Sequence, residues 1–137
     1  MSRKAMVLSR MTTNRKICNY IAPDGSAPIA DFINRLDIKL QKKIRAQLRQ
    51  LENSSFSLQP PNVKAFRQSR HKGFYEIRTR IRQAVRIIFV VDSDGNIVLL
   101  HGFIKKSDRA TERALETAGA RQLALTSGVA QIKEIIL

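Results

Sequence analysis

Hydrophobic residues in the first half of the chain recur with the spacing of amphipathic helices. A first helix is predicted to begin near Pro28, with Ser26 as its N-cap. Its apolar face consists of Ile29, Phe32, Ile33 and Leu36. Asp37 is the predicted N-cap of a second helix. The apolar stripe of that helix consists of Leu40, Ile44, Leu48 and Leu51. Because Pro60 and Pro61 bar continuation, the helical region is expected to end before them.

Alternating patterns of β-branched, aromatic and polar residues predict strands on both sides of these helices. "KICNYI" at 16–21 is the expected first strand. After the proline pair, the predicted strands are "VKAF" at 63–66, "FYEIRTRI" at 74–81, "AVRIIFVV" at 84–91 and "NIVLLHGFI" at 96–104. The connections between them are short and include an Asp94-Gly95 turn. The sequence therefore predicts an antiparallel meander.

A last helix completes the predicted α+β domain. Its N-cap is Ser107 or Asp108, and it carries Ala114, Leu115 and Ala118. We expect the helices to cover one face of the sheet and to leave the other partly open. The expected domain spans residues 16–120. Residues 1–15 are predicted to be a basic, flexible arm, and residues 121–137 are a tail of unassigned structure.

Strand parity places a set of charged side chains together on the open face. Along "FYEIRTRI", the residues Glu76, Arg78 and Arg80 point to one side of the sheet. The helix-packed side is assigned to Tyr75, Ile77, Thr79 and Ile81. If the strand register pairs the arginines of the two strands, Arg86 of the next strand lies near Arg78. Several guanidinium groups on a concave sheet suit phosphate oxygens. The alternative is an exposed basic face or a ring of arginine–carboxylate pairs.

The overall charge also favours an anionic partner. The 137 residues include 25 Lys plus Arg and 11 Asp plus Glu, which gives a formal charge of +14. Nucleic acid is the default partner, although an acidic protein or an anionic membrane would also be attracted. The second helix also carries a group of cations, which are Lys39, Lys42, Lys43, Arg45 and Arg49. They are interpreted as a solvent-exposed helix face in preference to nucleic-acid contacts.

Cysteine, histidine and hydropathy patterns limit the remaining classes of protein. Cys18 is alone and cannot form an internal disulfide, and we expect it to be a small buried residue. No apolar run is long enough for a membrane span, and no secretory signal is visible, so a soluble cytoplasmic protein without membrane contact is expected. One cysteine and two histidines lack ligand spacing, so neither a metal nor another cofactor is expected.

Residues 63–107 resemble the core of the RelE/ParE toxin superfamily, and in particular its phage-derived Gp49-like, HigB-type branch. The features are the Phe74 to Arg78 strand, the Arg86 strand, the acidic-Gly turn and "LLHGFIKKS" at 99–107. The "APDGSAPIADFINRLDIKLQKKIRAQL" segment also resembles that branch, so the likeness covers about residues 16–118. It implies a RelE-like fold, in which an antiparallel meander has two N-terminal helices packed on one face and one C-terminal helix.

The resemblance implies the toxin of a type II toxin–antitoxin system. Such toxins are typically ribosome-dependent mRNA endoribonucleases, or mRNA interferases, which inhibit translation. The implied partners are mRNA on the ribosome and a cognate antitoxin with a helix-turn-helix DNA-binding domain. Two alternatives remain open: a ParE-like toxin that acts on DNA gyrase without cutting RNA, and a basic RNA-binding domain without catalysis.

Site residues also follow from the resemblance. Arg78 and Arg86 match positions where related toxins carry essential basic residues, and they would stabilise phosphorane charge. Glu76 is interpreted as a general base or as the ion-pair partner that holds these arginines. Lys105 is a substrate contact and a candidate acid. Further RNA-binding candidates are Lys64, Arg67, Arg80, Arg82 and Lys106.

The two histidines are weighed separately. His101 lies in "LLHGF", where a hydrogen-bonded core histidine, or one that supports the site indirectly, is favoured over a general acid. His71 lies in the basic loop "RQSRHKG", and it is either solvated or an RNA contact. Related nucleases often have a late Tyr or His in the site, and no Tyr follows Tyr75 here. The sequence therefore leaves the proton-transfer groups open.

Overall fold

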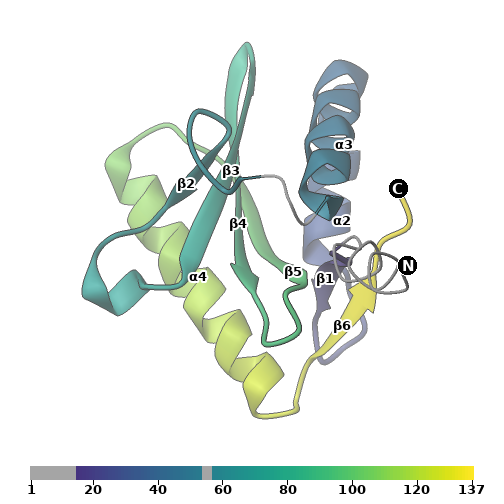
Figure 1. Cartoon of the computed structure of the whole chain (residues 1–137), viewed down its shortest axis with the longest axis vertical. Coiled ribbons are helices and arrows are strands. Elements are labelled where there is room, and N and C mark those ends of the chain that lie inside the picture. The colour runs from purple at the N-terminus through teal and green to yellow at the C-terminus, as the bar shows by residue number, and fades with distance from the viewer. Residues whose placement is uncertain (1–14, 54–56) are drawn as a thin grey trace, which may run out of the picture.

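A six-stranded sheet forms the centre of the computed structural model, which describes residues 15–53 and 57–137 (Figure 1). The strands are β1 (Ile17–Ile21), β2 (Val63–Ala65), β3 (Phe74–Ile81), β4 (Gln83–Val91), β5 (Ile97–Ile104) and β6 (Gln131–Glu134). The helices are α2 (Pro28–Asn34), α3 (Ile38–Glu52) and α4 (Asp108–Thr126), with the 3-10 turn η1 (Ser69–His71). The predicted α+β class is confirmed. The predicted flexible arm lies outside the described residues, except for residue 15.

The order of strands across the sheet is β2-β3-β4-β5-β1-β6. The four central segments of the sequence, β2 to β5, form the predicted antiparallel meander. β1 joins β5 in parallel, which the sequence analysis did not predict. The tail left unassigned forms the last turns of α4 and then β6, which pairs antiparallel with β1. All four residues of β6 are exposed, so the strand has no buried alternation that its sequence could reveal.

α2 and α3 pack on one face of the sheet. The predicted stripe of α3 is confirmed, because Leu40, Ile44, Leu48 and Leu51 are at most 2% exposed. Asp37 caps this helix, since its carboxylate accepts a hydrogen bond from Leu40 N at 3.0 Å. The predicted cap of α2 is wrong: Ala27 occupies the N-cap position. Ser26 belongs instead to the preceding turn, where its N–H donates to Asp24 Oδ1 at 2.9 Å.

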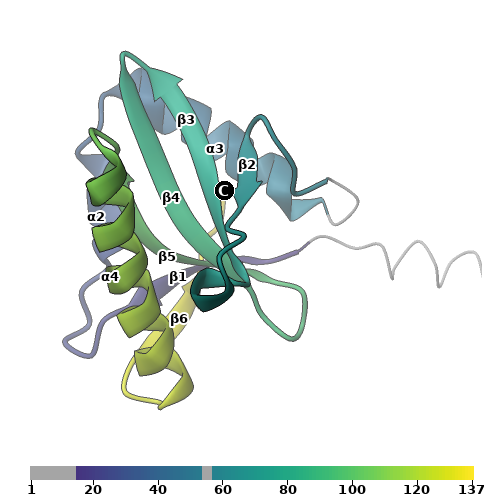
Figure 2. The same cartoon turned by 90° about the vertical axis from the view of Figure 1, so that its left-hand side faces the viewer.

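α4 packs on the opposite face, so the expectation that all helices cover one face is wrong (Figure 2). The two faces are distinguished by neighbouring residues of β5: Gly102 lies against Phe32 of α2, whereas His101 contacts Arg121 of α4. Of the two predicted caps of α4, Ser107 is the one observed, through a hydrogen bond from Ala110 N. Ala114, Leu115 and Ala118 are the buried residues of α4. Because a helix needs only one apolar stripe, the sequence of α4 does not specify which face it covers.

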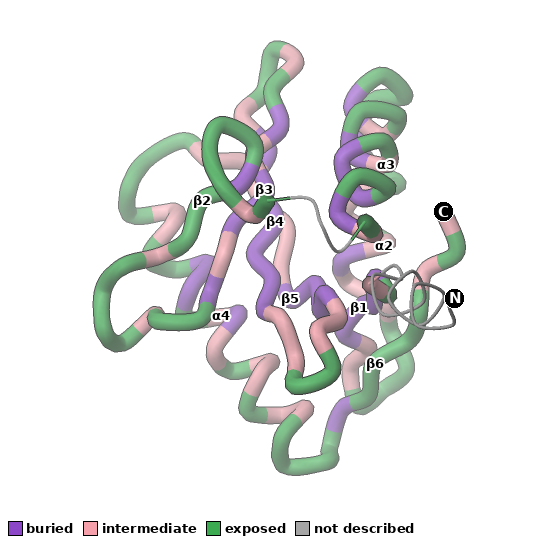
Figure 3. The backbone as a smooth tube through the Cα atoms, in the orientation of Figure 1, coloured by how far each residue is buried: buried purple, intermediate pink, exposed green. Residues whose placement is uncertain are grey.

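The core lies between the two helical layers and is richest along β4 and β5 (Figure 3). α4 packs on β5 and β4, so β2 and β3 are less covered on that face. Ile77 and Thr79 are buried on the α3 side, which confirms the predicted parity of β3. The residues of opposite parity on β3 are Glu76, Arg78 and Arg80. They lie on the less covered part of the α4 face, where a polar site can form.

None of the helices in the described ranges has the length and apolar character that a membrane crossing requires.

Candidate functional site

Arg78 of β3 and Arg86 of β4 lie directly opposite each other in the sheet, as the sequence analysis predicted. The Arg78 N–H donates to Asn62 O at 2.8 Å, on the side away from β4. Arg78 and Arg86 are therefore a non-hydrogen-bonded pair, the arrangement in which opposing side chains come closest. Two cations placed this way repel each other unless an anion lies between them.

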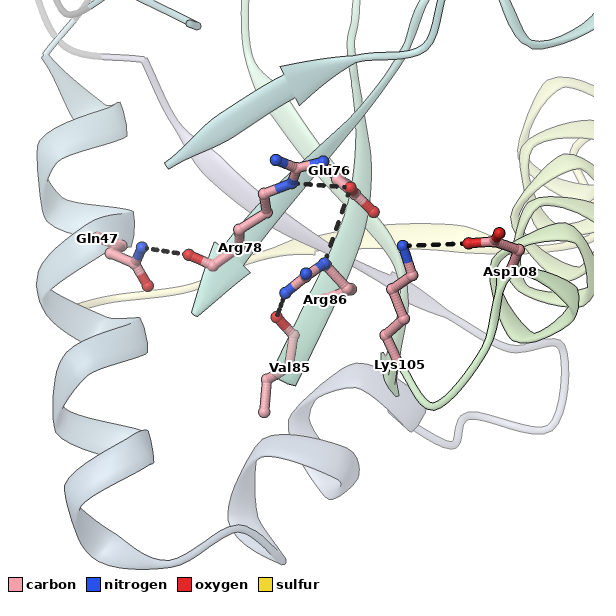
Figure 4. Close-up of polar contacts among 7 residues, drawn as sticks. All are labelled: Gln47, Glu76, Arg78, Val85, Arg86, Lys105 and Asp108. Atoms are coloured by element: carbon pink, nitrogen blue, oxygen red, sulfur yellow. Dashed lines mark hydrogen bonds and ion pairs between the residues drawn. The ribbon is translucent and has the colours of Figure 1, made fainter. Parts of the chain in front are cut away.

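Glu76 supplies that anion (Figure 4). Its Oε2 lies 3.1 Å from Arg78 Nε and 3.8 Å from Arg86 Nε. The Glu76 residue is only 2% exposed, whereas the side chains of Arg78 and Arg86 are 33% and 15% exposed. A buried carboxylate requires positive partners, and these two guanidinium groups provide them. In the free protein, this geometry matches the ion-pair interpretation of Glu76.

The cluster retains unused hydrogen-bonding capacity. Within the described part of the chain, Glu76 Oε1 and Arg86 Nε are buried and have no hydrogen-bond partner. The 3.8 Å separation is an ion-pair distance and is too long for a hydrogen bond. Burial lowers the pKa of Arg86, and Arg78 and Arg80 act in the same direction against the effect of Glu76. An incoming oxyanion would give this desolvated guanidinium a negative charge and a hydrogen-bond acceptor, as expected of a phosphate site.

The backbone beneath Arg78 is fixed from α3. Gln47 is 7% exposed, and its Nε2 donates to Arg78 O at 2.8 Å. Its Oε1 accepts a hydrogen bond from the Thr79 hydroxyl. β2 begins at Val63, so the carbonyl of Arg78 lies beyond the end of that strand, and the amide of Gln47 takes the place of a strand partner. α3 therefore positions the strand that carries the arginine.

A cleft of about 350 Å³ is formed next to β2, between η1 and the first turns of α4. Its lining residues are Lys64, Phe66, Arg67, Gln68, His71, Lys105, Asp108, Thr111, Glu112 and Leu115. Lys64 is the register partner of Glu76, and Lys105 extends beside Arg86 in Figure 4. Lys105 Nζ also lies 3.6 Å from Asp108 Oδ1. The cleft is therefore next to the arginine pair and shares one face of the sheet with it.

The structure brings together most of the candidate residues, but not all. Glu76, Arg78 and Arg86 form one cluster, and Lys64, Arg67 and Lys105 line the adjoining cleft. Arg80 is exposed on the same face, in register with Ala84. Two candidates fall outside this group. Arg82 has a φ of 66° at the hairpin tip and lines a hollow with the start of α3, and Lys106 is exposed but does not line the cleft.

Several residues of the cleft were not identified from the sequence, namely Phe66, Gln68, Thr111, Glu112 and Leu115. The capped start at Ser107 places positions 108, 111, 112 and 115 on one side of α4. That spacing was visible in the sequence. The sequence did not show which segment this side of α4 faces. The opposite wall of the cleft comes from residues 64–71, which are distant from α4 in the chain.

His71 and His101 have different surroundings. His71 lines the cleft, whereas His101 lies against α4 and is stacked on Phe103. Arg121 Nη1 is 3.3 Å from His101 Nδ1, and because arginine only donates, Nδ1 is the acceptor of a neutral ring. Burial and the charge of Arg121 lower the pKa of His101 to about 4. His101 is therefore a half-buried histidine held by Arg121, an environment that favours a structural role over that of a general acid.

No cluster of three His, Cys, Asp or Glu side chains suited to a metal ion occurs within residues 15–53 and 57–137. Cys18 is buried, as expected, and burial raises the pKa of its thiol.

Comparison with known proteins places this site within a family. Residues 31–122 match the family described as Phage derived protein Gp49-like (DUF891). The matched region runs from α2 into α4, so it contains the arginine pair and the whole cleft, while β1 and β6 lie outside it. No curated protein matches the chain. The family is consistent with the toxin of a toxin–antitoxin system and suggests a cognate antitoxin as partner. Because the match covers more than half of the chain, the protein belongs to the Gp49-like phage-derived family, which is the RelE/HigB-type toxin family.

Proposed function

We propose that this protein is a ribosome-dependent mRNA endoribonuclease, the toxin of a type II toxin–antitoxin system with a RelE-like fold. The observation that carries the proposal is the opposed pair Arg78 and Arg86 around a buried carboxylate, next to a basic cleft. Family membership and the formal charge of +14 support the same proposal. Cleavage of message would inhibit translation in the cytoplasm.

The proposed reaction is attack of a ribose 2′-hydroxyl on the adjacent phosphate, with departure of the 5′-oxygen. Charge builds on the phosphate oxygens in the transition state, and Arg78 and Arg86 are the groups that stabilise it. Guanidinium groups remain protonated, so these residues bind the phosphate and do not transfer protons. Since the chain supplies the positive charge, the proposed reaction requires no metal or other cofactor.

Proton transfer is assigned to groups at the edge of this site. Lys105 lies beside Arg86 and lines the cleft, so it is the proposed donor to the leaving 5′-oxygen. Glu76 holds the arginines in the free protein, and its unpartnered Oε1 is available to accept the proton of the 2′-hydroxyl once a phosphate engages them. His71, which also lines the cleft, is the alternative acceptor. Orientation of mRNA by the ribosome would supply much of the rate.

The remaining cations are proposed to bind the RNA backbone. Lys64 and Arg67 line the cleft, and Arg80 extends the positive surface along β3. Arg82 and Lys106 lie farther out and would contact flanking phosphates or ribosomal RNA. Each phosphate contact should steepen the salt dependence of binding.

The proposed antitoxin carries a helix-turn-helix DNA-binding domain and covers the arginine face with an acidic segment. Co-expression of the toxin with the adjacent small open reading frame should rescue growth. Failure of every neighbouring frame to do so would count against this partner.

Mapping of mRNA 5′ ends in a reconstituted translation reaction tests the nuclease. The parent should generate new 5′ ends, and Arg78→Ala and Arg86→Ala should cut at least about 100-fold more slowly. Arg49→Ala, on the exposed side of α3, is the charge-matched control and should cut normally. Circular dichroism confirms that each variant is folded. Intact message combined with DNA-damage signalling would instead indicate a ParE-like toxin acting on gyrase, and RNA binding without either effect would indicate a non-catalytic protein.

A further inference from the structure

The cleft beside the arginine pair has walls of opposite character. Lys64, Arg67 and Lys105 contribute positive charge, whereas Asp108 and Glu112 contribute negative charge from α4. A site for RNA backbone alone would gain nothing from carboxylates, because they repel phosphate. Asp108 is already paired with Lys105, and the other carboxylate, Glu112, suits a ligand that has a hydrogen-bond-donating part beside its phosphate.

We propose that this cleft binds the nucleobase next to the scissile phosphate and selects bases that carry an exocyclic amino group. The inference rests on the proposed function, since it assigns to that reaction a substrate class at its own site. Adenine, cytosine and guanine carry the amino group, and uracil does not. The cleft would thus disfavour uracil at one position of the cut.

The shape and apolar surface of the cleft suit a planar base. Its volume of about 350 Å³ lies in the range of small-molecule sites. Phe66 is partly buried in one wall, and Leu115 is buried in the other at 4% exposure. An aromatic ring stacks on any base, because every base has a π-face. Phe66 and Leu115 therefore provide affinity without selecting among bases.

Selection is assigned to Glu112 and Thr111. An ionised carboxylate only accepts hydrogen bonds, so Glu112 can pair with amino N–H groups. The single N–H on the base-pairing edge of uracil, N3–H, lies between two carbonyl oxygens, and both of these would be repelled by the carboxylate. Thr111 Oγ1 is buried and has no hydrogen-bond partner in the part of the chain that the structure describes. It lines the same cleft one residue before Glu112 and can donate to a ring nitrogen or carbonyl.

The position of the cleft relates the base to the phosphate. Lys105 lines the cleft and also lies beside Arg86. Lys64 lines the cleft and is the register partner of Glu76, which contacts both arginines. A nucleotide with its phosphate on Arg78 and Arg86 can thus place its base toward α4. The phosphate and the base would be bound by adjoining parts of one surface.

Titration of the full chain with AMP, CMP, GMP and UMP, followed by NMR, tests the proposal. The parent should bind the three amino-bearing nucleotides about ten-fold more tightly than UMP, the difference expected of one good hydrogen bond to a charged group. Glu112→Gln should reduce this preference to about two-fold or less, because an amide can donate as well as accept. Glu116→Gln, the same change one turn along on an exposed position of α4, should retain the parent's preference.

Inorganic phosphate separates base binding from phosphate binding. If all four nucleotides bind no better than phosphate, or if UMP binds as well as the others, the proposal is overturned. It is also overturned if Glu112→Gln keeps the full preference while its spectrum shows a native fold. Phe66→Leu should weaken all four nucleotides together, and unchanged affinity in that variant would remove the stacking role.

The same variants separate this inference from the nuclease itself. Nucleotide preference is measured without a ribosome, so it can stand if the parent fails to cut message, which would overturn only the proposed reaction. If the parent cuts, the new 5′ ends produced by Glu112→Gln should include uracil at one position where the parent avoids it. An unchanged base distribution would overturn the base site and leave the nuclease intact.

Discussion

Arg78 and Arg86 are opposed residues on neighbouring strands, and the carboxylate of Glu76 lies within ion-pair distance of both. In the free protein, this carboxylate offsets the repulsion between the two guanidinium groups. A phosphate bound at the same place would offset it as well. We therefore predict that phosphate binding replaces the internal ion pair, and this replacement can be measured.

Glu76→Gln should lower the free energy of unfolding by about 1–3 kcal/mol, because it leaves two neighbouring cations without their shared anion. Inorganic phosphate should restore more stability to this variant than to the parent, since the ion replaces the missing charge. Urea denaturation with and without phosphate measures both effects. Glu116→Gln is the control and should respond as the parent does. A Glu76→Gln protein as stable as the parent would show that the carboxylate does not hold the two arginines, and loss of cleavage in that protein would leave proton acceptance as its only role.

Gln47→Met should impair cleavage although Gln47 does not lie in the cleft. The change removes the amide that pairs with Arg78 O and the Thr79 hydroxyl, and it leaves both groups buried without partners. We expect a loss of about 1–3 kcal/mol in unfolding free energy. Displacement of the Arg78 strand should lower kcat more than it raises KM. Gln50→Met, on the exposed side of α3, is the matched control. Normal cleavage by folded Gln47→Met protein would show that Gln47 stabilises the fold without positioning Arg78.

Two glycine substitutions should change stability in opposite directions. A Cβ at Gly102 would lie 2.5 Å from Phe32 Cδ2, so Gly102→Ala should cost about 1–3 kcal/mol through overpacking between β5 and α2. Gly119 lies inside α4, where an added Cβ meets nothing within 4 Å. Gly119→Ala should therefore gain about 0.5–1 kcal/mol in helix propensity. Thermal unfolding measures both. Shortening Phe32 to Leu should make Gly102→Ala less costly, and a full cost in that background would argue against the contact.

Stability should fall on acidification because of His101. Its pKa is lowered to about 4 in the folded protein from an ordinary 6.5, so the unfolded chain binds the proton first as pH falls. The loss should begin near pH 6.5 and be complete near pH 4. Because the ring is only partly buried, we expect about 1–2 kcal/mol and not the full value of the shift. His101→Gln keeps an acceptor for Arg121 and should flatten this part of the stability–pH curve. Equal slopes for variant and parent in urea denaturation between pH 7 and 4 would contradict the assignment.

Much of the fold follows from local pattern. The stripe of α3, its Asp37 cap and the bounds of β3 could be predicted because each depends on residues close together in the chain. The N-cap of α2 could not, since Ser26 and Ala27 both precede Pro28 and the turn made by Asp24 decides between them. β6 was missed because its exposed residues carry no periodic signal and its partner β1 lies at the other end of the chain.

The shared face of Glu76, Arg78 and Arg80 follows from the sequence, because side chains alternate along any strand. Arg86 joins this face through the register of β3 and β4. The burial of Glu76 between the two arginines depends on what packs around the strand, so the structure was needed to reveal it. The tertiary structure also decided that α4 lies on their face of the sheet and that its first turns meet the β2–η1 segment. Contacts between such distant segments depend on the packing of the whole domain, and no local periodicity encodes them.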